Sequence, residues 1–181
     1  MTYTIETIEP IPKLVGTASS WSVINQSAPL GNGFSSKTWL GANVTILYPV
    51  WIPVRTPARR VWWVNGATVS GTAGVGLYSS DSQGAPSVLR WSQTAAQATI
   101  NVVQFTSIAT PDVVPPGLWW LALASTSATA TFFGTGFTQE GRFGTSKLEL
   151  ATNMPSSASG YAHSTGNQVG WAYGFATTDT P

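Results

Sequence analysis

Residues whose types could support catalysis or bind a metal ion are few and scattered in this chain. His163 is the single histidine, and there is no cysteine. The carboxylates closest in sequence are Glu6 with Glu9 and Glu140 with Glu149. Metal sites need clustered His, Cys or carboxylate ligands, and glycoside hydrolysis needs two facing carboxylates. We therefore expect no metal site, no cofactor and no catalytic residues.

Motifs for nucleophilic catalysis or phosphate binding are also missing from the sequence. A catalytic histidine needs a nucleophile and an orienting acid beside it. His163 instead lies in the loop-like stretch Y-A-H-S-T, and the chain has no G-x-S-x-G segment. It also has no G-x-x-x-x-G-K-[ST] segment that could hold a phosphate group. We interpret His163 as an ordinary loop residue and predict that the protein is not an enzyme.

Basic residues cluster only at Arg55, Arg59 and Arg60. Alternation along a strand places Arg60 on the face of Trp62, where a cation–π contact could form. The interpretation we favour is that these charges mark a strand end and discourage aggregation between sheets. With 8% charged residues and a formal net charge of +1, the chain lacks the basic surface that nucleic-acid binding requires.

The elements that must position any site are predicted to be short β-strands. The chain is rich in Thr, Ser, Gly and Pro, and it contains 9 Trp, 7 Phe and 5 Tyr. This balance is typical of an all-β fold with many turns. No window of helical length has a 3.6-residue apolar period. We predict an antiparallel β-sandwich of jelly-roll character with an extended N-terminal arm.

Three segments are expected along the chain. Residues 1–43 alternate weakly and contain early prolines, so we interpret them as an arm that makes docking or oligomer contacts outside the sandwich. Residues 44–135 carry the dense strand signals of the β-sandwich domain. Residues 136–181 form a C-terminal extension, in which V-G-W-A-Y-G-F at 169–175 is a closing strand. No apolar run resembles a signal peptide or a membrane-spanning helix.

Glycine-containing signals punctuate the predicted strands. Asn65–Gly66 follows a strong strand and predicts a tight hairpin turn with positive φ at both residues. The D-S-Q-G segment at 81–84 predicts a second turn. Gly74 and Gly76 lie inside a predicted strand, where close packing is the expected reason for glycine.

Two tryptophan pairs, V-W-W-V at 61–64 and L-W-W-L at 118–121, raise a packing problem. Neighbouring side chains on a strand point to opposite faces, so one Trp of each pair faces away from the core. Three environments are open to it: cover by the same chain, an interface with an identical subunit, or a stacking platform for sugar rings. The candidate interface or glycan contacts are Trp62, Trp120, Arg60, Trp21 and Trp39. The candidate core residues are Trp63, Trp119, Leu121, Leu123, Val75 and Leu77.

The run R-R-V-W-W-V-N-G-A-T-V-S-G-T-A-G-V-G-L-Y at 59–78 resembles a module of tailed-bacteriophage virion surface proteins. The resemblance continues through D-S-Q-G, the strand at 98–106, P-P-G-L-W-W-L-A-L at 115–123 and T-A-T-F-F-G at 129–134. Similar chains are minor tail, tail-fibre or capsid decoration proteins. The similar part spans about residues 50–134 and is a pattern of strands, with no catalytic motif.

The resemblance implies a non-enzymatic structural protein on the virion surface, assembled in the cytoplasm of the host bacterium. The leading expectation is a tail-tip or fibre component that contributes to host attachment. The alternatives are a capsid decoration protein that stabilises the head shell and a free carbohydrate-binding module. Expected partners are identical subunits, as a trimer by analogy, other virion proteins of the tail or capsid, and a host-surface glycan. Nucleic acid and membrane insertion are not expected.

Overall fold

The computed structural model describes the fold over residues 14–15, 22–24, 35–137, 145–149, 154–158, 162–164 and 168–177. Regular structure within these ranges is β-strand, and none of it is a helix long and apolar enough to cross a membrane. The strands are β1 (Leu14–Val15), β2 (Ser22–Ile24), β3 (Ser35–Thr38), β4 (Val44–Ile52), β5 (Thr56–Val64), β6 (Thr72–Ser80), β7 (Pro86–Ala96), β8 (Val103–Val114), β9 (Gly117–Ser125), β10 (Thr131–Phe137), β11 (Thr145–Glu149), β12 (Ala162–Ser164), β13 (Gln168–Trp171) and β14 (Tyr173–Ala176).

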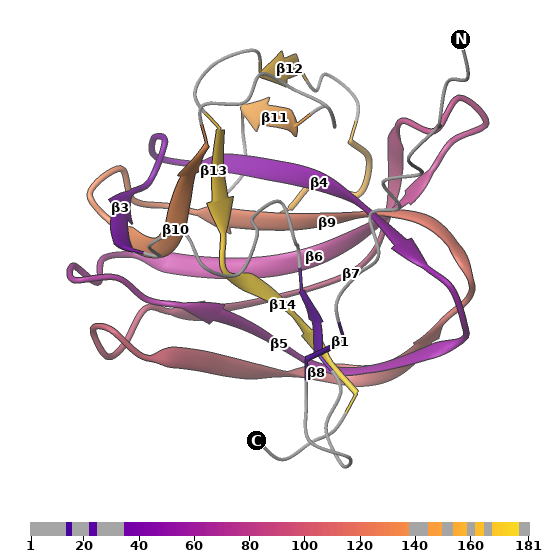
Figure 1. Ribbon diagram of the computed structural model, residues 1–181, viewed down its shortest axis with the longest axis horizontal. Helices are drawn as coiled ribbons and strands as arrows, with labels where there is room; N and C mark the ends of the chain where they lie inside the picture. The colour runs from indigo at the N-terminus through magenta and orange to yellow at the C-terminus, as the bar shows by residue number, and fades with distance from the viewer. Residues whose placement is uncertain are drawn as a thin grey trace, which may run out of the picture.

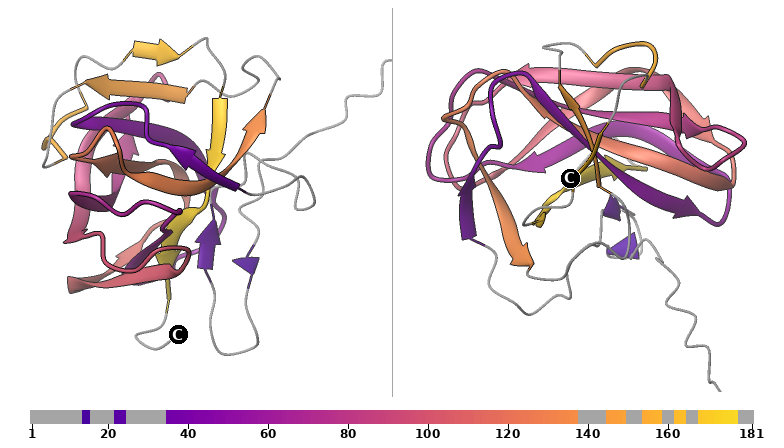
Figure 2. Two further views of the ribbon diagram at one scale, coloured as in Figure 1. Left: turned by 90° about the vertical axis from the view of Figure 1, so that its left-hand side faces the viewer. Right: turned by 90° about the horizontal axis from the view of Figure 1, so that it is seen from above.

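Eight of these strands have the connectivity of a jelly roll (Figure 1). The first sheet has the order β1-β2-β14-β5-β8, and the second sheet has the order β12-β11-β4-β9-β6-β7. If the strands β2, β4 to β9 and β14 are numbered 1 to 8 along the chain, the sheets contain 1-8-3-6 and 2-7-4-5. This is the double Greek-key order of a jelly roll. The two sheets pack face to face (Figure 2), and the predicted all-β sandwich is confirmed.

The remaining strands extend the sandwich. β11 and β12 continue the second sheet beyond β4, and β13, β10 and β3 form a small side sheet. Only Ala172 separates β13 from β14. One continuous segment near the C-terminus therefore contributes first a strand of the side sheet and then a strand of the first sheet. The closing strand expected at 169–175 therefore corresponds to β13 and β14.

The predicted boundary between arm and sandwich at residue 43 differs from the structure. β3 pairs with β10, and β2 pairs with β14 inside the first sheet. Trp39, expected to contact a subunit or glycan, is instead 3% exposed and lies in the core. Its ring centroid is 5.1 Å from that of Phe132 and 5.1 Å from that of Trp171. The described strands of the arm thus complete the sandwich itself, where we expected contacts outside it.

The core lies between the two main sheets and follows the alternation of side chains along each strand. On β9, Trp119, Leu121 and Leu123 point inward, whereas Trp120 and Ala122 belong to a separate cluster on the outer face. Burial of this apolar surface is the main favourable contribution to folding. The six candidate core residues, Trp63, Trp119, Leu121, Leu123, Val75 and Leu77, are all in the inner cluster.

The outer face of the second sheet is covered by the segment 154–158. Met154 and Ala158 pack there with Leu47, Tyr78 and Trp120. The Tyr78 hydroxyl donates a hydrogen bond to the Pro155 carbonyl at 2.9 Å, and burial raises the pKa of Tyr78. The outward Trp120 is therefore covered by the same chain, which was the first of the three environments considered.

Asn65 is the centre of a buried hydrogen-bond network at one end of the sandwich. Its side-chain oxygen accepts hydrogen bonds from Trp63 Nε1 at 2.9 Å and Gln97 Nε2 at 3.0 Å. Its Nδ2 donates to the Thr99 carbonyl at 3.0 Å and to Gln104 Oε1 at 2.8 Å. Both acceptor sites and both donors of the amide are thereby satisfied, as a fully buried amide requires.

The hairpin turn predicted at Asn65–Gly66 is wrong. Neither residue has positive φ, and β5 and β6 belong to different sheets, so the chain crosses between sheets here. Gly66 is needed for space: a Cβ atom at this position would collide with the side-chain oxygens of Ser36 and Thr131. Position 65 therefore requires Asn because of the hydrogen bonds that its side chain makes. Position 66 requires Gly because β3 and β10 approach closely.

Replacing Asn65 by Ala should destabilise the protein strongly. The substitution leaves the Trp63 indole without its buried partner, and it takes one of two partners from Gln97 Nε2 and from Gln104 Oε1. An unpaired buried group costs about 1–3 kcal/mol, and the cavity left by the amide adds to this. We expect the free energy of unfolding, measured by urea denaturation, to fall by at least about 3 kcal/mol. Gln83→Ala, which removes an exposed amide, is the control and should change stability by less than about 0.5 kcal/mol. A loss below about 1 kcal/mol for Asn65→Ala would contradict the role of the network.

Candidate binding surfaces

Three of the four tryptophans expected to contact a partner lie in the described part of the chain, and all three are covered. Trp62 on β5 is 8% exposed and Trp120 on β9 is 6% exposed. Trp39 is part of the core, and Trp21 lies outside the described residues. A sugar ring needs an open aromatic face to stack on, so none of the three described tryptophans can serve as the platform.

Arg60 also differs from its predicted role. It is 5% exposed and lies on the outer face of the first sheet, so it cannot act as a surface charge at a strand end. Its guanidinium carbon is 4.3 Å from the ring centroid of Phe105, which lies on the neighbouring strand β8. The cation–π contact considered for Arg60 is thus made with Phe105. Arg55 and Arg59 remain exposed and could still discourage aggregation.

Among the described tryptophans, Trp51 is the one that presents a large open surface. It is 49% exposed on the outer face of β4, next to Leu118 of β9 in the register of the second sheet. Its neighbours in the chain, Val50 and Ile52, are buried in the core. The sequence held the signal for this orientation, because Ile46, Tyr48, Val50 and Ile52 alternate as one apolar face.

A rigid polar turn lies at the same end of the second sheet. Asp81 Oδ1 accepts hydrogen bonds from the backbone N–H groups of Gln83 at 2.8 Å and Ala85 at 2.9 Å. Gly84 has φ +82°, and its carbonyl accepts a hydrogen bond from Trp120 Nε1 at 3.0 Å. The D-S-Q-G segment therefore forms the predicted turn, and it is fastened to β9. In Figure 1 this β6–β7 hairpin tip rises at the right-hand end of β4 and β9.

A second exposed surface follows the edge strand β8 and the turn before it. β8 pairs with β5 and stands at the end of the first sheet. Between residues 100 and 105, four of six side chains are large, apolar and exposed: Ile100, Val102, Val103 and Phe105. Long edge strands are usually protected by charges or covered by other elements. An apolar edge of this kind is a typical contact surface for another protein.

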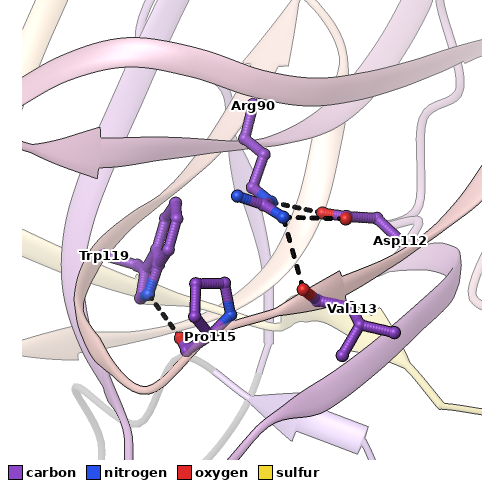
Figure 3. Close-up of polar contacts among 5 residues, drawn as sticks. All are labelled: Arg90, Asp112, Val113, Pro115 and Trp119. Atoms are coloured by element: carbon purple, nitrogen blue, oxygen red, sulfur yellow. Dashed lines mark hydrogen bonds and ion pairs between the residues drawn. The ribbon is translucent and has the colours of Figure 1, made fainter.

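An ion pair closes the open side of the sandwich between β7 and β8 (Figure 3). Arg90 makes a two-pronged contact with Asp112, with Arg90 Nη2 2.8 Å from Asp112 Oδ1. The guanidinium also donates to the Val113 carbonyl at 3.3 Å and lies 5.3 Å from the Trp119 ring centroid. Trp119 is fixed in turn by a 3.0 Å hydrogen bond from its Nε1 to the Pro115 carbonyl.

Two β-bulges bring these charges together. Arg90 is the extra residue of β7 where the pairing with β6 shifts between Leu77 and Tyr78. On β8, residues 108–111 bulge opposite Arg59, just before Asp112. Bulges bend a strand and redirect its side chains, so the irregular backbone is what aligns Arg90 with Asp112 across the two sheets.

The hydrogen bond from Arg90 lowers the pKa of Asp112, and the charge of Arg90 and the Val113 backbone N–H act in the same direction. A carboxylate whose pKa is lower in the folded state stabilises the protein above its unfolded pKa of about 3.9. That stabilisation is lost as the pH falls through the lower folded pKa. The ion pair should therefore be effective at neutral pH and absent in strong acid.

A double-mutant cycle of Arg90→Ala and Asp112→Asn tests this ion pair. We expect a coupling free energy of about 1 kcal/mol at pH 7, because both groups are partly exposed but the contact is two-pronged. The coupling should be smaller at pH 2 than at pH 7, because protonation of Asp112 in acid removes the ion pair. Unfolding in urea at both pH values gives the measurement, and Lys37→Ala with Asp112→Asn is the control cycle with no expected coupling. Equal coupling at both pH values would contradict the electrostatic explanation.

The described residues thus present contact surfaces: Trp51 with the 81–85 turn, and the apolar stretch 100–105. Among these residues, no group of three or more His, Asp or Glu side chains could hold a metal ion. No protein-family model and no curated protein matches the chain. A function must accordingly be inferred from the chemistry of its own surfaces.

Proposed function

We propose that this chain is a non-enzymatic structural protein on the surface of a tailed-phage virion, in the tail tip or fibre, where it contributes to host attachment. The observation that carries the proposal is the exposed apolar stretch 100–105, which leads into the edge strand β8. A chain whose edge strand is open and almost uncharged is suited to assembly with other subunits. Exposed Trp51 gives the same chain a surface for a ligand.

The resemblance to phage surface proteins supports the choice of a virion. The residues that carry the resemblance lie in the parts of the chain that build the sandwich. Asn65 holds one end through hydrogen bonds, and the turn at 81–85 is hydrogen-bonded to β9. The side chains of β9 pack into the clusters on both faces of the second sheet. The shared pattern is therefore one of scaffold, on which attachment surfaces can differ between proteins.

Assembly of identical subunits through β8 is the simplest use of its edge. The strand has 12 residues, and its only charged side chain, Asp112, is neutralised by Arg90. Copies can therefore approach along this edge without repulsion between like charges. Closed symmetry is the usual arrangement of identical subunits, and we propose a trimer.

Immunogold electron microscopy of intact virions, with an antibody against this chain, tests the proposed location. Label at the tail end is the expected result. Label distributed over the head would instead identify a capsid decoration protein, for which the same edge strand could bind the shell. Absence of label from the particles would overturn a virion function and favour a free carbohydrate-binding module.

Val103→Lys should weaken the self-association. The substitution places a charge in the middle of the exposed apolar stretch, where it would be buried on assembly. We expect light scattering coupled to size-exclusion chromatography to give an oligomer for the wild-type protein and mainly monomer for the variant. Val54→Lys, which adds the same charge at an exposed valine outside β8, should leave the oligomer intact. A monomeric wild-type protein, or an unchanged Val103→Lys oligomer, would contradict assembly through this surface.

A further inference from the structure

We propose that Trp51 and the turn at 81–85 form a binding site for a neutral sugar ring of a surface glycan. The proposal rests on the attachment function proposed above and names the site and ligand class for it. The exposed Trp51 takes the place of the covered Trp62 and Trp120 as the sugar platform.

The platform is the exposed indole of Trp51. Alternation along β4 directs Val50 and Ile52 into the core, so Trp51 must face away from it. Its neighbour on β9, Leu118, is partly covered, and the two form an apolar floor. The C–H face of a sugar ring is apolar and fits an aromatic surface, while its hydroxyl groups need hydrogen-bond partners at the rim.

The turn at 81–85 supplies those partners. Asp81, Ser82 and Gln83 are exposed, and their side chains carry donors and acceptors suited to sugar hydroxyls. The backbone beneath them is held by the hydrogen bonds to Asp81 Oδ1 and by that from Trp120 to the Gly84 carbonyl. A turn that is ordered before binding loses little conformational entropy when the ligand arrives.

The sheet places the platform and the turn within reach of one ligand. Trp51 lies opposite Leu118, and the Ser80 hydroxyl donates a 2.8 Å hydrogen bond to the Leu118 carbonyl. Two strand spacings, about 10 Å, thus separate Trp51 on β4 from the start of the turn on β6. The turn also packs against the apolar floor, since a Cβ atom on Gly84 would lie 3.6 Å from Leu118 Cδ2.

The charge of the site selects the kind of sugar. The carboxylate of Asp81 is the one charged group of the turn and of the floor formed by Trp51 and Leu118. An acidic sugar would be repelled by this carboxylate, whereas a neutral sugar can donate a hydroxyl hydrogen to it. Neutral hexoses and N-acetylhexosamines are therefore the expected ligands.

The test is binding of the full chain to an array of oligosaccharides built from glucose, galactose, mannose, rhamnose or N-acetylglucosamine. Saturation-transfer NMR on the best binder then maps the contact. We expect the wild type to bind at least one neutral oligosaccharide. Trp51→Ala should weaken that binding by about tenfold or more, and Trp51→Phe should restore most of it, because a phenyl ring can also stack. Leu40→Ala, which removes another exposed apolar side chain, is the matched control.

Unfolding midpoints measured for every variant separate loss of the site from loss of the fold. No binding by the wild type on the array, or equal binding by wild type and Trp51→Ala, would overturn the sugar site. The virion location is read independently by immunogold labelling. Labelled tails together with unchanged sugar binding by Trp51→Ala would refute the sugar site and keep the attachment function. Sugar binding that depends on Trp51, without labelled virions, would keep the sugar site and refute the attachment function.

Discussion

The buried amide of Asn65 is the constraint on which one whole end of this sandwich depends. Three of its four hydrogen bonds join the end of β5 to residues 97–104, and the fourth holds the Trp63 indole. Backbone hydrogen bonds from Asn65 to Val102 and from Asn101 to Gly66 hold the same connection in place. A polar group without partners at this depth would be costly, so the amide fixes where the chain crosses between the sheets. The same hydrogen bonds therefore hold the exposed stretch 100–105 in position.

The opposite end of the sandwich is organised by an irregular backbone and an ion pair. Bulges in β7 and β8 align Arg90 with Asp112 and close the open side between the sheets. The outward face of β9 is closed by the segment 154–158. Because both tryptophan pairs are used for packing, the surfaces that we propose for recognition among the described residues are Trp51 with its turn and the stretch 100–105. Within the same strands, some residues therefore pack the core and others form the exposed contact surfaces.

Alternation and turn composition were sufficient to predict the all-β sandwich and the inward face of 118–124, since both depend on local periodicity. The role of Asn65 could not be predicted in this way. Its partners Gln97 and Gln104 are 32 and 39 residues away, and N-G is also a common turn signal. The Arg90–Asp112 pair spans 22 residues and needs two bulges. Trp51 was predictable from the alternation of 46–52, but cover of Trp120 by 154–158 was not.

Native-state hydrogen exchange measures most directly whether the Asn65 network holds the fold together. The amides of Asn65, Gln97 and Asn101 lie in or beside loops, and each donates a backbone hydrogen bond between the β5–β6 and β7–β8 connections. If the network is an integral part of the sandwich, these amides should open with the same free energy as those of β9, that is, only with global unfolding. Exchange through local opening at much lower free energy, while β9 stays protected, would contradict this account.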